Sequence, residues 1–212
     1  MIYYSIEKLV NAGITEILIV TGIEHCGSII AQCGDGKDFN CNLTYKVQAE
    51  AGGIAQALLL AEQFVGNDTV CVILGDNIFK RNLFQDVLSF NKNYGAQIFL
   101  KKVDDPYRFG VAIGHKTSEM TKNQLLIQEI EEKPKNPKSN LAVTGIYMYD
   151  SSVFNKIKTI KPSTRGELEI TDINNLYIKE NKMIAIIMND DEWWTDAGTF
   201  NSLQIANKLI NI

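Results

Sequence analysis

Residues 70–77 read Val-Cys-Val-Ile-Leu-Gly-Asp-Asn, an apolar run that ends in a glycine and an acidic residue. An uninterrupted apolar run such as Val70–Leu74 is typical of a strand buried on both faces of a parallel sheet. Ligands of α/β folds bind beyond the carboxyl ends of such strands, so Asp76 is predicted to lie at the ligand-binding edge. Taken alone, the Gly-Asp-Asn sequence is more typical of a turn than of a metal site.

The residues before this run alternate between helical and extended patterns. Apolar residues recur with helical spacing over Ile2–Val10, and Gly13 ends that predicted helix. Strand-like runs follow at Ile17–Val20 and Leu43–Val47, and a helical stretch covers Ile54–Phe64. This alternation predicts an α/β fold with right-handed crossovers.

The second half of the sequence predicts a mixed sheet that forms one wall of a pocket. Its strand-like runs are Ala96–Val103, Gly110–Ile113, Leu125–Glu131, Ala142–Tyr149 and Met183–Met188. Helices are predicted at Val153–Lys158, Glu169–Glu180 and Phe200–Ile210. Because no linker or repeat marks a second unit, we expect a single domain over residues 1–212.

Composition and charge exclude several classes of partner. The 212 residues, 45% of them hydrophobic, are enough to bury the core of one globular domain. A formal charge of −4 provides no basic excess for a nucleic-acid backbone. The chain has no run of about 18 apolar residues, the length of a membrane span, and its first residues are helical in pattern rather than those of a signal peptide. We therefore expect a cytoplasmic protein with no nucleic-acid or membrane partner.

Cysteine and histidine offer no metal or nucleophile pattern. The four cysteines, without CxxC spacing, are Cys26, Cys33, Cys41 and Cys71. They could form two disulfides, but the lack of a secretory signal favours reduced thiols, with Cys71 in the core. His25 and His115 are far apart in sequence, and both are predicted to lie on the surface.

A second acidic residue changes the interpretation of Asp76. Residues 194–199 read Trp-Thr-Asp-Ala-Gly-Thr and place Asp196 in a predicted loop before a helix. Magnesium usually takes only one or two protein carboxylates and completes its shell with water and substrate phosphates. Asp76 and Asp196 together are therefore candidates to hold Mg²⁺.

Three further segments have both a structural and a functional interpretation. Residues 48–57 place Gln48 and two glycines at a strand-to-helix turn, where the backbone could approach a flat ligand. Glu132 and Lys133 offer a carboxylate for sugar hydroxyls and a cation for a phosphate, although such a pair is also typical of a solvated turn. Arg165 precedes a predicted helix and could reach an anionic ligand, whereas its acidic neighbours fit a helix start.

In this order and spacing, seven strings together resemble the glucose-1-phosphate thymidylyltransferase family over essentially the whole chain. The strings cover residues 53–57, 74–79, 105–111, 131–134, 142–147, 165–172 and 194–199. The resemblance implies a Rossmann-like, three-layer α/β/α nucleotidyltransferase with a mixed, mostly parallel sheet. It also implies transfer from dTTP to glucose 1-phosphate, which makes dTDP-glucose and pyrophosphate for dTDP-rhamnose-type sugar nucleotides and surface polysaccharides.

The resemblance also assigns roles to individual residues. Gln48 and Gly53 would contact the thymine, and Asp76 and Asp196 would hold Mg²⁺, with Asp76 also touching substrate. Trp194 would pack beside the second metal carboxylate.

The sugar side of the site follows in the same way. By resemblance it would be lined by Gly110, Glu132, Val143 and Thr144. Lys133 and Arg165 would face the sugar phosphate and act as the catalytic cations. No side-chain nucleophile is implied, because phosphoryl transfer depends mainly on positioning and charge stabilisation.

Two departures from the family pattern limit the resemblance. The chain lacks about thirty N-terminal residues, which in the family form the first strand and a glycine-rich phosphate loop with an Arg. We therefore expect the first strand of the sheet to be missing and the chain as given to be inactive. The C-terminal extension of longer members is also absent, so a monomer and a homo-oligomer both remain open.

Two alternatives to the thymidylyltransferase hypothesis stay open. The pocket could use UTP or another nucleotide, because discrimination of one methyl group is worth only about 1 to 3 kcal/mol. The chain could also be a non-catalytic subunit that binds sugar nucleotides.

Overall fold

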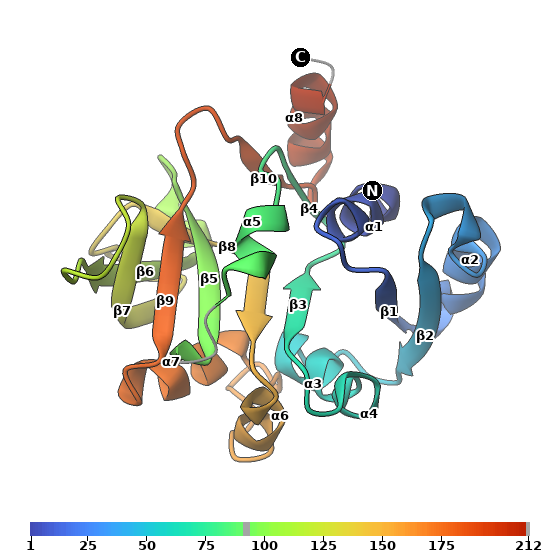
Figure 1. The fold of residues 1–212 in the computed structure, drawn as a ribbon, viewed down its shortest axis with the longest axis horizontal. Coiled ribbons are helices and arrows are strands. Elements are labelled where there is room, and N and C mark those ends of the chain that lie inside the picture. Colours follow the sequence, from blue (N-terminus) through green and yellow to red (C-terminus); the bar gives the residue numbers. More distant parts are fainter. Residues whose placement is uncertain (91–93, 211–212) are drawn as a thin grey trace.

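A mixed sheet of six strands forms the centre of this computed structural model, which describes residues 1–90 and 94–210 (Figure 1). In spatial order the strands are β3 (Val70–Ile73), β8 (Leu141–Tyr149), β5 (Ala96–Lys102), β9 (Met183–Ile187), β7 (Gln124–Glu132) and β6 (Gly110–His115). Four of them, β3, β5, β9 and β6, run in one direction, and β8 and β7 run in the other. The predicted mixed, mostly parallel sheet is confirmed in this sense of strand direction.

Helices pack on both faces of this sheet, and a short strand packs on one of them. On one face, Ile98 and Leu100 of β5 pack against α3 (Ile54–Leu59), α6 (Ser152–Ile157) and α7 (Ile170–Lys179). Phe99, which points the other way, packs with residues of α5 (Phe84–Leu88) and β4 (Asn77–Phe79). Successive side chains of a strand point to opposite faces, so β5 contributes to both cores.

The N-terminal residues form a separate parallel pair, β1 (Glu16–Gly22) and β2 (Asn42–Gln48). Helices α1 (Ile2–Asn11) and α2 (Ile23–Cys33) pack around it, and a core forms from Ile6, Leu9, Ile17, Ile19, Cys33 and Cys41. All four cysteines are free thiols, as predicted. Cys71, predicted to lie in the core, is only half-buried at the edge of two cores, whereas Cys33 and Cys41 are buried. His25 and His115 are exposed, also as predicted.

A cavity of about 1030 Å³ separates β1 from β3. Leu18 and Val20 of β1 line it from one side, and Val70 and Val72 of β3 line it from the other. Within the described residues, β3 pairs only with β8. The prediction that Val70–Leu74 is a strand buried on both faces is therefore wrong, because residues 70–74 are only half-buried. One edge of β3 lies against this cavity instead of against another strand.

Several short elements differ from the sequence-based expectation. The predicted helix at 54–64 is broken into α3 and α4 (Glu62–Val65), and α2 was not predicted. Residues 194–196, expected in a loop, form strand β10 (Trp194–Asp196), which pairs antiparallel with β4. The C-terminal helix α8 (Phe200–Ile210) has the predicted bounds. Three-residue strands such as β4 and β10 are too short to give a periodic signal, which is why the sequence did not reveal them.

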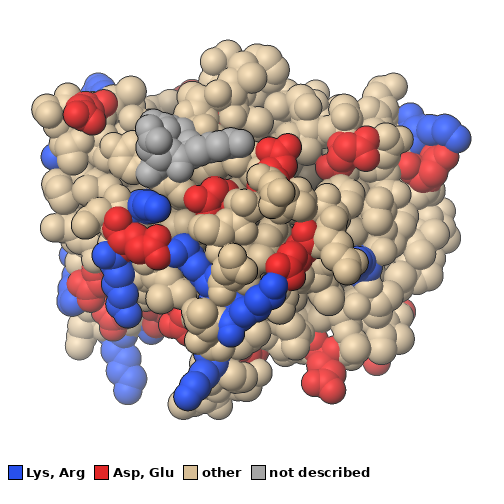
Figure 2. Space-filling model, turned by 60° about the horizontal axis from the view of Figure 1, so that its bottom comes forward, with Lys and Arg blue, Asp and Glu red and all other residues tan. Residues whose placement is uncertain are grey.

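The surface has side chains of both charge signs, as expected from the small net charge of −4. Figure 2 shows a face on which Lys and Arg side chains lie among Asp and Glu side chains. No helix in residues 1–90 and 94–210 is long and apolar enough to cross a bilayer.

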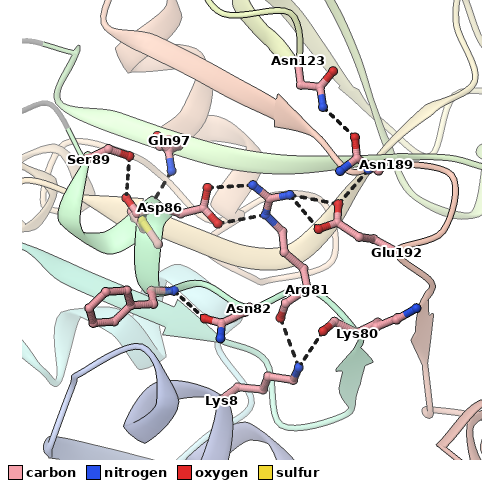
Figure 3. A network of polar contacts seen from close by, with 12 residues as sticks. Lys8, Lys80, Arg81, Asn82, Asp86, Ser89, Gln97, Asn123, Asn189 and Glu192 are labelled. Carbon is pink, nitrogen blue, oxygen red and sulfur yellow. Dashed lines mark hydrogen bonds and ion pairs between the residues drawn. The ribbon is translucent and has the colours of Figure 1, made fainter.

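A buried ion cluster links the segments that follow β4 and precede β10 (Figure 3). The guanidinium of Arg81 donates two hydrogen bonds of 2.8 Å to Asp86 and two of 2.9 Å to Glu192. Asp86 is 4% exposed, and its carboxylate forms an ion pair of 2.8 Å with Arg81. Lys8 of α1 donates to the carbonyl oxygens of Lys80 and Arg81, which ties the N-terminal helix to the same segment.

We expect Arg81→Met to lower the free energy of unfolding by about 3 kcal/mol, because it leaves two buried carboxylates without their cation. Urea unfolding followed by circular dichroism measures this loss. Lys37→Met is the matched control, because it breaks the exposed pair with Asp35 and should leave the unfolding free energy unchanged. Equal effects of the two substitutions would contradict a special role for the cluster.

Candidate active site

One pocket of about 270 Å³ collects most of the predicted site residues. It is lined by nine of the eleven: Asp76, Gly110, Glu132, Lys133, Val143, Thr144, Arg165, Trp194 and Asp196. These residues come from the end of β3, from β6, β7, β8 and β10, and from the segment before α7. Residues separated by more than a hundred positions in sequence therefore meet in one place.

The other two predicted residues, Gln48 and Gly53, line the larger cavity instead. The two spaces adjoin, since Ile54, Leu74 and Glu167 line both. Gly53 has φ +93°, and a Cβ there would lie 2.5 Å from the carbonyl oxygen of Leu168. Only glycine fits this turn, because residues 167 and 168 fill the space that a side chain would take. The predicted approach of this backbone to a flat ligand stays a prediction.

The two predicted metal carboxylates are brought together by strand pairing. Asp196 lies opposite Asn77 in the β4–β10 ladder, and the N–H of Ala197 donates to the carbonyl oxygen of Asp76 at 2.7 Å. Both side chains are half-buried and line the same pocket.

Asn77 is the residue that locks this corner, and the sequence analysis missed it. Its Oδ1 accepts hydrogen bonds from Trp194 Nε1 at 2.7 Å and from the backbone N–H of Gly145 at 3.0 Å. Because both partners are pure donors, the orientation of the amide is fixed, and Nδ2 donates to Asp76 Oδ1 at 2.8 Å. The buried amide of Asn77 is thus held by β8 and β10, and it orients the carboxylate of Asp76, a candidate metal ligand.

Arg108 is a second residue that the sequence analysis missed. Its guanidinium lies 2.9 Å from Asp105 and 3.4 Å from Asp196, and it lines the pocket. The hydrogen bond to Asp105 is the main cause of the raised pKa of Arg108. The adjacent Phe109 packs edge-on against Trp194, so a cation and two aromatic rings border the second carboxylate.

Glu132 and Lys133 are held at the end of β7. Glu132 Oε2 accepts a hydrogen bond of 2.8 Å from the Thr171 hydroxyl, and a Cβ on Gly110 would lie 3.3 Å from the same oxygen. Lys133 has φ +44°, and its N–H donates to the carbonyl oxygen of Phe109. A left-handed lysine is uncommon and is maintained here by that backbone bond.

Arg165, Val143 and Thr144 complete the predicted set. Arg165 is exposed and pairs with Glu169 at 2.8 Å, which raises the pKa of the guanidinium. The Thr144 hydroxyl donates to the carbonyl oxygen of Phe99 at 3.0 Å, so it is already engaged inside the sheet. Val143 presents an apolar surface to the pocket.

Comparison with known proteins identifies the family. Residues 1–211 match the model of the nucleotidyl transferases. A curated glucose-1-phosphate thymidylyltransferase from Neisseria meningitidis is 41% identical over 212 residues, which is 99% of this chain and 71% of that protein. The chain belongs to the nucleotidyl transferase family. The family predicted from the sequence motifs is therefore confirmed.

Other relatives of this nucleotidyltransferase agree. A nucleotidyltransferase of low-salt glycan biosynthesis from Haloferax volcanii is 36% identical over 98% of this chain and 56% of its own length. Among solved structures, a chain from Bacillus anthracis assigned to the glucose-1-phosphate thymidylyltransferases is 53% identical, with a TM-score of 0.87 over 98% of this chain and 81% of its own. A UDP-glucose pyrophosphorylase has a TM-score of 0.84 at 23% identity, covers 98% of this chain and 85% of its own, and shows the shared fold.

The nucleotidyltransferase pocket fits a magnesium ion that also needs substrate phosphates. Within the described part of the chain, no group of three His, Cys, Asp or Glu residues could hold a metal by itself. Asp76 and Asp196 form a pair instead, and Gly198 leaves room beside Asp76 Oδ2, since a Cβ there would lie 3.3 Å away. Two carboxylates with open space match the few protein ligands that Mg²⁺ takes.

We expect Gly145→Ala to disturb this corner, because its Cβ would lie 2.5 Å from Cγ of Asn77. The unfolding free energy should fall by about 1 to 3 kcal/mol, as for other overpacked sites. The indole ¹H–¹⁵N signal of Trp194 should also shift, because its acceptor has moved. Gly27→Ala, whose Cβ meets nothing within 4 Å, serves as control. An unshifted indole signal in Gly145→Ala would refute the proposed contact.

Proposed function

We propose that the chain is a glucose-1-phosphate thymidylyltransferase that acts in nucleotide-sugar and surface polysaccharide biosynthesis. An oxygen of glucose 1-phosphate attacks the α-phosphorus of dTTP, the bond from that phosphorus to the bridging oxygen breaks, and pyrophosphate leaves with the electron pair. The single observation that carries this proposal is one pocket lined by the carboxylates of Asp76 and Asp196, by three cationic side chains and by Glu132, which can accept hydrogen bonds from sugar hydroxyls. A cytoplasmic location remains a prediction.

Charge stabilisation in this reaction falls to residues that line the pocket. Bound between Asp76 and Asp196, Mg²⁺ would supply Lewis-acid stabilisation of the nucleotide phosphates. Lys133 has no ion pair among the described residues, so its ammonium is free to face the sugar phosphate. Arg165 reaches the same phosphate if it exchanges its half-exposed pair with Glu169. Such preorganised charges, rather than a nucleophile, lower the barrier of phosphoryl transfer.

Glu132 would select the sugar. The Thr171 hydroxyl occupies one of its oxygens, which leaves the other to accept a hydrogen bond from a sugar hydroxyl. Hydrogen bonds to a charged carboxylate are stronger than those to a neutral acceptor. Gln48 and Gly53, on the adjoining cavity, would receive the base.

The named relatives favour thymidylyl transfer, but the choice of nucleotide is open to direct test. Pyrophosphate release by the chain extended with the first-strand segment of a related thymidylyltransferase is measured with dTTP, UTP, ATP, CTP and GTP against glucose 1-phosphate. The proposal requires dTTP to give the highest kcat/KM. A non-catalytic subunit that binds sugar nucleotides would bind dTDP-glucose yet release no pyrophosphate with any pair.

In the chain extended by the first-strand segment of a related thymidylyltransferase, we expect Asp76→Asn and Asp196→Asn each to remove most turnover while the fold is retained, because each loses a hard anionic ligand of Mg²⁺. The loss should be about 100-fold or more and should shrink at high magnesium concentration. Asp190→Asn, which makes the same chemical change at an exposed site, is the control. Normal magnesium dependence in both variants would exclude this metal site.

We also propose that full activity needs a strand in the cavity between β1 and β3. Unpaired N–H and C=O groups on facing strand edges favour pairing with another extended segment. Apolar side chains from both strands line the space, which suits a strand with apolar residues. In the family the segment before the matched region would supply this strand and the phosphate loop after it, so we expect the 212 residues alone to have low activity.

This requirement is tested by adding the first-strand segment of a related thymidylyltransferase before Met1. Pyrophosphate release should rise at least about 100-fold, since several charge-stabilising donors return together. The urea midpoint should also rise. The same segment with prolines at alternate positions cannot pair and should give neither gain. Equal activity with and without the segment would show that the cavity does not need a strand.

A further inference from the structure

One residue that lines the candidate pocket has a buried polar group without a hydrogen-bond partner. Thr171 and Asn174, one turn apart on α7, both line the pocket. Asn174 is 1% exposed. Among the described residues, its Nδ2 is one of two buried side-chain polar atoms with no hydrogen-bond partner, the other being Ser5 Oγ.

The other end of the same amide is fully used. Asn174 Oδ1 accepts a hydrogen bond of 2.6 Å from the Tyr149 hydroxyl. Burial raises the pKa of Tyr149 well above its usual value, so this hydroxyl keeps its proton and donates it. Even if the amide were turned over, a single tyrosine hydroxyl could satisfy only one of its two ends. One polar end of Asn174 therefore stays unpaired in either orientation.

A buried polar group without a partner costs free energy and is rare in folded proteins. Asn174 lines the candidate pocket together with Glu132. Thr171 occupies one oxygen of the Glu132 carboxylate, and the other is an acceptor. The two residues thus offer one donor and one acceptor, which matches neighbouring hydroxyl groups of a sugar ring, because each hydroxyl can both donate and accept.

We propose that Asn174 is a specificity-determining residue whose side-chain NH₂ donates a hydrogen bond to a ring hydroxyl of the sugar phosphate. The inference rests on the proposed sugar-phosphate site and adds to it a donor that acts together with Glu132. A sugar lacking that hydroxyl would leave the amide unpaired in the complex and bind more weakly.

The test compares two variants that lose the same internal bond. Asn174→Leu removes both the bond to Tyr149 and the unpaired NH₂. Tyr149→Phe removes only the bond to Asn174. Isothermal titration measures the binding of glucose 1-phosphate, of its monodeoxy analogues and of inorganic phosphate to each protein. Thermal melting checks folding, and Asn174→Ser replaces Asn174→Leu if the latter fails to fold.

We expect Asn174→Leu to weaken glucose 1-phosphate binding about tenfold more than Tyr149→Phe, a typical value for one lost hydrogen bond. Inorganic phosphate should bind all three proteins equally. One monodeoxy analogue should bind the unmodified protein about tenfold more weakly than glucose 1-phosphate does and show no further loss in Asn174→Leu, because the same bond is already absent.

Two results would overturn the inference by different routes. In each protein, the affinity of every monodeoxy analogue is compared with that of glucose 1-phosphate. If these affinity losses are the same in Asn174→Leu as in the unmodified protein, Asn174 contacts no sugar hydroxyl and its NH₂ pairs with water only. If the unmodified protein binds glucose 1-phosphate no more tightly than inorganic phosphate, the sugar site of the proposed function fails as well.

Discussion

The buried side-chain amide of Asn77 is the contact on which the geometry of the site depends. It accepts hydrogen bonds from two strands, at Gly145 on β8 and Trp194 on β10, and donates to Asp76. Gly145 must lack a side chain to leave room for this amide. A buried amide with every polar group paired specifies one arrangement, because any displacement leaves donors unsatisfied. The short β4–β10 pair is thereby fixed against the large sheet.

The Arg81 cluster supports the same corner from the other side. Arg81 follows β4 and Glu192 precedes β10, so their ion pair joins the two strands at one end of the ladder (Figure 3). Asn77 and Asp196 lie at the other end. The hydrogen bonds of Asn77 therefore stabilise one end of the β4–β10 pair, and the buried ion pairs of Arg81 stabilise the other. Together they hold two strands of three residues each, which would otherwise be marginal in water.

The sequence predicted what local patterns encode and missed what only tertiary pairing creates. Asp76 follows the end of β3, as predicted, because a strand end has a clear pattern, and the nucleotidyltransferase motifs indicated most of the residues that line the pocket. Asn77 was interpreted as part of a turn, and no local pattern singled out Arg108 or Asn174. The edge position of β3 was missed because an apolar run does not reveal how many neighbours a strand has.

Under the proposed function, the charged residues of the pocket would bind a ligand by exchanging ion-pair partners. Arg165 pairs with Glu169 and Arg108 with Asp196, and both guanidiniums are at least 40% exposed. Exposed pairs of this kind contribute about 0 to 1 kcal/mol, so a phosphate or a metal ion can replace either partner at little cost. The Arg81 pairs are buried and cannot be exchanged in this way. The same ion-pair chemistry therefore gives a rigid support behind the site and exchangeable cations within it.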